Sequence, residues 1–306
     1  MKHVSISVII CTKNRIQDFK NTVASLTHQS RILDELIVID SSDDTATKEF
    51  IASGNFPFES HYFHVGPGLT FARNIGIQKS TGDLLFFFDD DVELEQNYIS
   101  HIEQVFLDDT QNEIGAVGGR ILNESLEEET MTLYSFFKRK VFNLIRYVFL
   151  QSRLGNGRFR YSGMPTQPHA SGVSRYIECL SGGCMAFHRE VFDKVRFDEK
   201  LIGYGHVEDA DISKQVLTAG YKIYYEARAT LDHFPSPQDR PNAKKLAELT
   251  VINYAYFFRK HWSQTWLRKA SFWWTLAGLC LVFIPSAGWR GVFSGVRKIS
   301  HEDYLL

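Results

Sequence analysis

Apolar and polar positions along the first 120 residues form blocks that predict strands and helices in turn. Short apolar runs rich in β-branched and aromatic residues predict buried strands at 4–11, 35–40, 61–65, 84–88 and 114–118. Apolar residues at helical spacing predict helices at 14–28, 45–53, 69–79 and 96–106. Strands that alternate with helices favour crossover connections. We therefore predict an α/β fold with a mostly parallel, twisted sheet flanked by helices.

The second half of the chain is less regular. A stretch rich in basic and aromatic residues, from about 131 to 161, interrupts the α/β rhythm and is typical of an insertion. Strand-like patterning resumes at 176–187, followed by a predicted helix at 208–219 and a strand at 222–225. Beyond Pro235 the pattern predicts an apolar, helical C-terminal extension. These changes divide the chain into regions 1–118, 119–235 and 236–306.

Composition and charge add a second feature. With 306 residues, 44% of them hydrophobic, the chain can bury a sizeable core. The net charge of −2 hides a strong segregation: the stretches 130–177 and 249–301 hold 15 basic residues and no acidic one, which leaves 19 basic and 36 acidic residues elsewhere. Two surfaces of this kind predict contact with something anionic.

Targeting and cysteine signals are weak. The four cysteines have no metal-ligand spacing, and the first residues lack a signal-peptide pattern, so we expect a reduced, intracellular chain.

Three polar clusters directly follow predicted strands. They are Thr12-Lys13-Asn14-Arg15, Asp40-Ser41-Ser42-Asp43-Asp44 and Asp89-Asp90-Asp91. In open α/β sheets, ligands bind beyond the carboxyl ends of the strands, where such clusters converge. The sequence therefore predicts a single site at this edge of the sheet.

The three successive aspartates repel one another unless a cation offsets their charge. Alternate residues of an extended segment point the same way, so Asp89 and Asp91 can share a ligand while Asp90 points elsewhere. Hard oxygen ligands suit Mg²⁺ or Mn²⁺. A solvated acidic turn is the other interpretation.

The segment GLTFARNIGIQKSTGDLLFFFDDDVEL (residues 68–94) resembles the donor-binding segment of the family-2 glycosyltransferases, which have the GT-A fold. The T-x-N-R that begins at Thr12 and the V-x-D that ends at Asp40 extend the resemblance, which covers roughly residues 4–235. Ser41-Ser42 departs from the Asp-Gly of many members. That departure leaves the identity of the bound base open.

The resemblance implies roles in donor binding. Thr12 and Asp40 are expected to contact the nucleoside, with Asp40 accepting from a base N–H. Arg15 and Arg73 are expected near the nucleotide, and an ion pair on a helix surface is the alternative for Arg73. The remaining donor-site residues implied are Asp89 and Asp90.

The second half supplies the implied acceptor chemistry. Gly182 and Gly183 allow close approach of the backbone to a ligand, although they also fit a plain turn. The segment 203–211 resembles the family's E-D-x-D element, with Asp209 as general base and Glu208 as an acceptor contact. An ordinary acidic helix N-terminus is the alternative. Asp211 is expected to be structural.

His233 follows the strand that is expected to return towards the site. By the resemblance it completes the metal site with Asp89 and Asp91, and an imidazole ligand favours Mn²⁺ over Mg²⁺. A structural histidine is the alternative.

The predicted function is an inverting hexosyl or deoxyhexosyl transfer. One base and no candidate protein nucleophile imply inversion of the anomeric configuration. A nucleotide-diphosphate sugar is the expected donor, a UDP-sugar ahead of dTDP- or GDP-sugars, and the acceptor is a glycan or polyprenol-linked hydroxyl of the cell envelope. A nucleotidyltransferase and a non-catalytic, membrane-associated nucleotide-sugar-binding scaffold are the competing hypotheses. No nucleic-acid-binding motif is present.

The basic aromatic segments predict peripheral or re-entrant attachment to the cytoplasmic face of an anionic membrane. Residues 136–150 mix aromatic with basic side chains, as in a surface-lying amphipathic helix. Residues 270–289 are uncharged and lie between Lys269 and Arg290. An interfacial hairpin, a true span and a helix pair buried against the catalytic domain all fit this second segment.

Overall fold

The computed structural model describes residues 4–123, 144–151, 157–166, 168, 172–201, 203, 206–236, 238 and 241–299. Most of the predicted insertion at 131–161 lies outside these residues, as do Tyr204 and Gly205. The strands are β1 (Ile6–Thr12), β2 (Glu35–Asp40), β3 (Glu59–His64), β4 (Leu84–Phe88), β5 (Val92–Leu94), β6 (Ile114–Ile121), β7 (Arg175–Ile177), β8 (Cys184–His188) and β9 (Lys222–His233). The helices are α1 (Ile16–Thr27), α2 (Ala46–Ser53), α3 (Leu69–Lys79), α4 (Tyr98–Asp108), α6 (Glu208–Thr218), α7 (Ala243–His261) and α8 (Trp266–Ile299), with a 3₁₀ helix at Arg189–Asp193.

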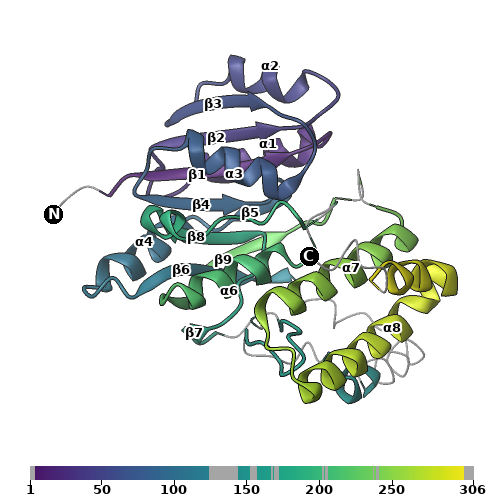
Figure 1. Ribbon diagram of the computed structural model, residues 1–306. Helices are drawn as coiled ribbons and strands as arrows, with labels where there is room; N and C mark the ends of the chain where they lie inside the picture. The colour runs from purple at the N-terminus through teal and green to yellow at the C-terminus, as the bar shows by residue number, and fades with distance from the viewer. Residues whose placement is uncertain are drawn as a thin grey trace, which may run out of the picture.

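One mixed sheet forms the centre of the molecule (Figure 1). Its strands lie in the order β3-β2-β1-β4-β8-β6-β9-β5, and β7 also pairs with β9. Six strands run in one direction, while β5, β7 and β8 run antiparallel to their neighbours. The predicted α/β fold with a mostly parallel sheet is therefore confirmed. Antiparallel β8 joins the β3-β2-β1-β4 part of the sheet to the β6-β9-β5 part, because it lies between β4 and β6.

Both faces of the sheet are buried, which explains the continuous apolar runs of its strands. In β4, Leu84, Phe86 and Phe88 pack into one core with α1, α2 and α4. Leu85 and Phe87 point the other way, into a second core with α3 and α6. The alternation along each strand thus assigns the helices to two layers around the sheet.

Strand β5 is absent from the sequence-based prediction, and β9 is much longer than predicted. Only 222–225 was expected to be a strand, yet β9 continues to His233. Its second half gains two neighbours, β5 on one side and the end of β6 on the other. Pairing with distant segments extends the strand, because backbone hydrogen-bonding partners are a property of the tertiary fold.

Helices α7 and α8 form a separate apolar layer on one side of the sheet (Figure 1). Fully buried Asp211 of α6 anchors α7 by accepting hydrogen bonds from Lys260 (2.9 Å) and His261 (2.7 Å). Asp211 thus has the structural position expected of it.

The C-terminal apolar helix bends at Gly288, where the backbone has φ 66° and ψ 166°. We call residues 266–287 the first limb of α8 and 289–299 the second limb. The first limb packs Phe272 against Tyr254 and Phe258 of α7. The second limb returns along the same helix, since Gly295 lies against Val251. In this conformation the segment 270–289 belongs to a bent helix pair packed on α7.

By length and composition, helix α8 could cross a membrane. In its most apolar stretch, only 33% of the residues are buried within the protein. Large apolar side chains are exposed along it, among them Trp266, Trp273, Trp274, Leu281, Trp289 and Phe293. The two limbs of α8 therefore do not form a helix pair that is wholly buried against the rest of the protein. The exposed face is compatible with membrane association.

Glu248 of α7 holds the second limb in place. It accepts hydrogen bonds from Lys298 (2.7 Å), Ser294 (2.8 Å) and Lys245 (3.0 Å). The hydrogen bond from Lys298 is the main cause that lowers the pKa of Glu248 from its usual 4.5 to about 2. A depressed carboxyl pKa stabilises the fold above the unfolded-state pKa, and this contribution is lost as the pH falls from about 4.5 towards 2.

We expect Glu248→Gln to lower the free energy of unfolding by roughly 2 kcal/mol at pH 7, as for a hydrogen bond to a charged group. The difference from wild type should shrink as the pH is lowered towards 2. Urea unfolding across this pH range measures both effects. A pH-independent difference would contradict the assignment to the Glu248 carboxylate.

Candidate active site

The acidic turn after β4 points its side chains in two directions. Asp90 is 3% exposed and turns inward, where it accepts hydrogen bonds from Thr12 Oγ1 (2.7 Å) and Arg15 Nη1 (3.1 Å). Asp89 and Asp91 each bring one oxygen near His233, and Asp91 Oδ2 also lies 3.8 Å from Arg15 Nη1. The sequence predicts that Asp90 faces away from the other two aspartates, but Asp90 and Asp91 lie in a turn and not in an extended strand.

Antiparallel pairing of β5 with β9 brings His233 to the acidic turn. The register pairs Val92 with His233, so Asp91 lies next to the histidine. His233 Nε2 is 3.1 Å from Asp91 Oδ1. One ligand atom each from Asp89, Asp91 and His233 lies within 4.8 Å of the others. Sequence reasoning selected Asp89 and Asp91 from their spacing and His233 from the resemblance; the β5–β9 pairing is what brings His233 to the two aspartates.

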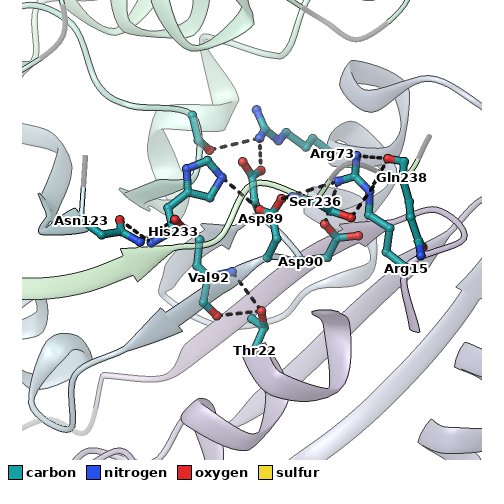
Figure 2. Close-up of polar contacts among 12 residues, drawn as sticks. Arg15, Thr22, Arg73, Asp89, Asp90, Val92, Asn123, His233, Ser236 and Gln238 are labelled. Atoms are coloured by element: carbon teal, nitrogen blue, oxygen red, sulfur yellow. Dashed lines mark hydrogen bonds and ion pairs between the residues drawn. The ribbon is translucent and has the colours of Figure 1, made fainter. Parts of the chain in front are cut away.

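Several residues that hold this cluster were not foreseen from the sequence. Asn123 exchanges two hydrogen bonds with the backbone of His233, at 2.7 and 3.0 Å. Thr22 does the same for the backbone of Val92, at 2.7 and 3.1 Å (Figure 2). The backbone N–H of Ser236 donates to Asp91 Oδ2 at 3.0 Å. The one local signal was the apolar–polar–apolar triplet Val92-Glu93-Leu94, which is typical of a short strand.

Arg73 of α3 is buried between the two halves of the site. It is 3% exposed and donates to Glu208 Oε1 (2.7 Å), Asp89 Oδ1 (3.3 Å) and the carbonyl of Gly182 (3.1 Å). Its guanidinium also lies over the ring of Phe197, 5.2 Å from the centroid. Arg73 is therefore a bridge between the acidic turn and the start of α6, rather than an ion pair on a helix surface.

Gly182 and Gly183 let carboxylates approach the backbone between β7 and β8. A β-carbon at Gly183 would lie 3.2 Å from Asp89 Oδ2, and one at Gly182 would lie 2.8 Å from Glu208 Oε1. The β-carbon at Gly182 would also lie 3.8 Å from Asp209 Oδ2. The pair of glycines thus brings Asp89 and Asp209 to neighbouring positions along one short backbone segment.

Asp209 lies in the first turn of α6, where the helix N-terminus favours a negative charge. Its Oδ1 accepts from the backbone N–H of Ala210 at 2.7 Å, and the residue is partly exposed. Val207, just before the helix, has φ 71°, a strained conformation for a β-branched residue. Such strain is found where surrounding structure fixes a functional segment.

Burial and repulsion between neighbouring carboxylates change the pKa values of the acidic residues in the site. Burial is the main cause that raises the pKa of Glu208 to about 7; Asp209 adds to it and Arg73 opposes it. Burial likewise raises the pKa of Asp90 to about 7, against the opposing effects of Arg15 and Thr12. Burial also acts to raise the pKa of Asp91, but hydrogen bonds from His233 and Ser236 outweigh it and lower that pKa.

Two residues predicted to contact the nucleotide have internal partners. Asp40 is fully buried, and it accepts from Ser42 N (2.8 Å), Ser42 Oγ (2.5 Å) and Tyr62 Oη (2.9 Å). Arg15 donates twice to the carbonyl of Gln238, at 2.9 and 3.1 Å. Because the Asp40 side chain has no exposed surface, its contact with a base requires the residues that cover it to move.

The cluster of Asp89, Asp91 and His233 fits a divalent cation. It offers two hard carboxylate oxygens and one imidazole nitrogen, a donor set that suits Mn²⁺ and leaves room for phosphate oxygens and water. Asp91 keeps a lowered pKa and so remains an anionic ligand. Asp89 is the most exposed of the three aspartates, with 35% of its side chain accessible.

Comparison with known proteins places this site in context. The family model described as Glycosyl transferase family 2 matches residues 7–196. A Haemophilus influenzae protein described as uncharacterized is 35% identical over 97 residues, which are 29% of this chain and 51% of that relative. The chain thus spans about half the length of the relative it matches.

Two solved structures are similar in fold. The mannosyltransferase PcManGT from Pyrobaculum calidifontis, in complex with GDP-Man and Mn²⁺, has a TM-score of 0.57 and 13% identity over 98% of this chain and 76% of its own. The crystal structure of GalNAc-T7 with UDP, GalNAc and Mn²⁺ has a TM-score of 0.57 and 16% identity. That match covers 93% of this chain and 59% of GalNAc-T7. These likenesses establish the GT-A fold.

We expect Arg73→Met to lower the free energy of unfolding by roughly 3–5 kcal/mol, because it leaves Glu208 buried without its cation. Adding Glu208→Gln should recover part of the loss, since a neutral amide needs no counter-charge. Urea unfolding in EDTA compares the three chains. Lys222→Met, which breaks an exposed pair with Glu113, is the control and should change little. An unchanged midpoint for Arg73→Met would contradict the bridge.

Titration with Mn²⁺ tests the cluster directly. His233→Ala and Asp89→Asn should each weaken Mn²⁺ binding by about tenfold or more, measured by calorimetry. Asp90→Asn is the matched control, because that carboxylate faces Thr12 and Arg15. If Asp90→Asn weakens binding as much as Asp89→Asn, the assignment of ligands is wrong.

Proposed function

The chain belongs to glycosyl transferase family 2, and from this premise we propose that it is a metal-dependent, inverting glycosyltransferase acting on a nucleotide-diphosphate sugar. Family membership and the GT-A fold give the general class, which is glycosyl transfer. The metal-dependent, inverting mechanism is supported by the positions of two carboxylates: Asp209 lies beside Gly182, and Asp89 lies beside Gly183. Arg73 links the two sides, because it donates to Asp89 and to Glu208, the neighbour of Asp209. A base and a cation site separated by one short backbone segment suit transfer from a diphosphate to a hydroxyl.

The donor half of the proposed site comprises Thr12, Arg15, Asp40, Arg73, Asp89 and Asp90. A divalent cation held by Asp89, Asp91 and His233 would neutralise charge on the diphosphate leaving group. The resident side chains contribute by fixing the acidic turn: Thr12 and Arg15 hold Asp90, and Arg73 holds Asp89. We propose Mn²⁺ or Mg²⁺ as the ion and a UDP-sugar as the first donor to try. The two Mn²⁺-bound neighbours carry UDP and GDP-Man, so GDP-sugars belong in the same test.

Asp209 is the proposed general base. It lies in the first turn of α6, where its carboxylate can accept the proton of the acceptor hydroxyl. Glu208 turns towards Arg73 and Gly182, so its proposed contribution is to shape the acceptor side together with Gly182 and Gly183. With one base and no protein nucleophile in the proposed scheme, attack by the acceptor oxygen gives inversion.

We propose a glycan or polyprenol-linked acceptor of the cell envelope and attachment to the cytoplasmic face of the membrane. The support is the exposed apolar face of α8 and the lack of acidic residues from 249 to 301. Basic and aromatic side chains together suit an anionic bilayer surface. The proposed division is a donor half at 1–118, an acceptor half at 119–235 and a membrane-associated region at 236–306.

A panel of nucleotide-sugars with Mn²⁺, followed by thermal shift and by release of nucleoside diphosphate, tests this function. We expect one donor to raise the midpoint of wild type and Asp209→Asn alike, because the base does not hold the donor. Release of nucleoside diphosphate should fall by about 10²-fold or more in Asp209→Asn. Glu93→Gln, which changes an exposed carboxylate of β5, is the control and should keep full activity.

Equal turnover by Asp209→Asn and wild type would remove Asp209 as the base. Donor binding with no turnover in wild type would instead favour a non-catalytic nucleotide-sugar-binding protein.

A further inference from the structure

An apolar groove lies between the two limbs of α8. The bend at Gly288 folds the second limb back beside the first, and both limbs line the groove. Its volume is about 390 Å³, within the range of roughly 300–1,000 Å³ that is usual for small-molecule sites. Its lining consists of Phe149 and, from α8, Trp273, Leu276, Ala277, Cys280, Leu281, Ile284, Trp289, Val292, Phe293 and Val296.

The groove is apolar in its floor and at its rim. Leu276 and Val292 are buried beneath it, whereas Trp273, Trp289 and Phe293 are about half exposed at its edge. Among the residues that the structure describes, none of the lining side chains is charged. A groove of this composition offers nothing to the hydroxyls of a sugar or to a nucleotide, but it suits a hydrocarbon chain, whose transfer from water to an apolar surface is favourable.

The charges around the groove indicate the other end of such a ligand. Lys269 and Arg290 bracket the uncharged stretch, and Arg297 follows the lining residue Val296. These basic residues are exposed, and no acidic residue lies between 249 and 301. A chain that carries an anionic headgroup therefore fits the groove better than a neutral one.

The groove is joined to the acceptor side of the candidate active site. Leu276 of its floor belongs to the same buried cluster as Cys179 and Ala210. Cys179 precedes the segment that contains Gly182 and Gly183, and Ala210 follows Asp209 in α6. The donor elements β1 to β4 contribute nothing to this cluster. A molecule seated in the groove is thus attached to the elements that we assign to the acceptor.

We propose that the groove between the limbs of α8 binds the hydrocarbon chain of an anionic lipid that carries the acceptor. This inference rests on the proposed function and deepens it: the acceptor is a lipid-linked phosphate whose chain is held by the protein itself. The exposed face of α8 contacts the bilayer, and the groove takes one chain out of it. Chain binding also keeps the acceptor hydroxyl close to the enzyme, which raises its effective concentration.

Dodecyl phosphate below its micellar concentration is the probe. Trp273 and Trp289 line the groove, so tryptophan emission of the full chain reports binding. We expect a saturable change in wild type and none with inorganic phosphate. Ala277→Phe, which fills the groove from an exposed position, and Leu281→Gln should each weaken binding by about tenfold or more. Unchanged affinity in both variants, or an equal response to inorganic phosphate, overturns the groove as the site.

Ser286→Phe is the matched control, because it adds the same ring to an exposed position of the first limb that does not line the groove. It should bind dodecyl phosphate as wild type does. The thermal midpoints of Ala277→Phe and Ser286→Phe should agree, since both changes are on the surface.

Three further measurements distinguish a lipid-linked acceptor in the groove from bulk lipid or a second copy of the chain. Flotation with phosphatidylcholine–phosphatidylglycerol vesicles should be equal for Ala277→Phe and Ser286→Phe; selective loss in Ala277→Phe would assign the groove to bulk lipid and overturn the proposal. A change in molar mass of Ala277→Phe by light scattering would assign it to a second copy of the chain, with the same consequence. Incorporation of labelled sugar into solvent-extractable lipid should fall about tenfold in Ala277→Phe alone.

Failure of the groove and failure of the proposed function give different results. The thermal shift with nucleotide-sugar and Mn²⁺ does not involve α8. If no donor binds but dodecyl phosphate still does, the glycosyltransferase assignment fails and the groove stands. If donors bind and turn over but no variant alters chain binding, only the groove fails.

Discussion

Repulsion among five crowded carboxylates, three of them buried, is the constraint on which the site depends. Asp89, Asp90, Asp91, Glu208 and Asp209 converge at one edge of the sheet, and two buried guanidinium groups offset part of their charge. Arg15 compensates Asp90 and Asp91, and Arg73 compensates Asp89 and Glu208. Burial is the main cause that raises the pKa values of Asp90 and Glu208 to about 7, and neighbouring carboxylates add to it against the opposing effect of the two arginines. An edge that remains electronegative after its internal pairing is suited to a cation and to substrates that bring one.

The same constraint links the two halves of the fold. Antiparallel β8 lies between β4 and β6, so the acidic turn after β4 and the glycine pair before β8 are neighbours. Arg73 then ties that turn to α6 with hydrogen bonds to Asp89, Gly182 and Glu208. The proposed donor-side and acceptor-side elements are therefore held together both by strand pairing and by the Arg73 side chain. A family-2 glycosyltransferase needs such a geometry, because the reacting atoms come from two different substrates.

The C-terminal helices connect the candidate active site to the exposed apolar face of α8. Asp211, two residues after Asp209, holds α7 through Lys260 and His261, and α7 in turn packs against both limbs of α8. The basic, apolar layer is thus attached to the helix that carries the proposed base. The charge segregation along the sequence has a structural counterpart: the acids of the site lie at the edge of the sheet, and α8 beyond α7 carries basic but no acidic residues.

The sequence by itself determined the α/β fold, the bounds of β2, β4 and α3, and the clustering of polar residues at strand ends, because those features follow from local periodicity. It also grouped Asp89 with Asp91 and set Asp90 apart, although Asp90 and Asp91 lie in a turn and both approach Arg15. Only the tertiary structure decided that β5 pairs with β9 beside His233, that Arg73 bridges Asp89 and Glu208, and that α8 bends into a grooved pair. These features depend on partners more than 100 residues apart or on packing against another helix, and no local pattern encodes a contact whose free energy comes from a distant segment.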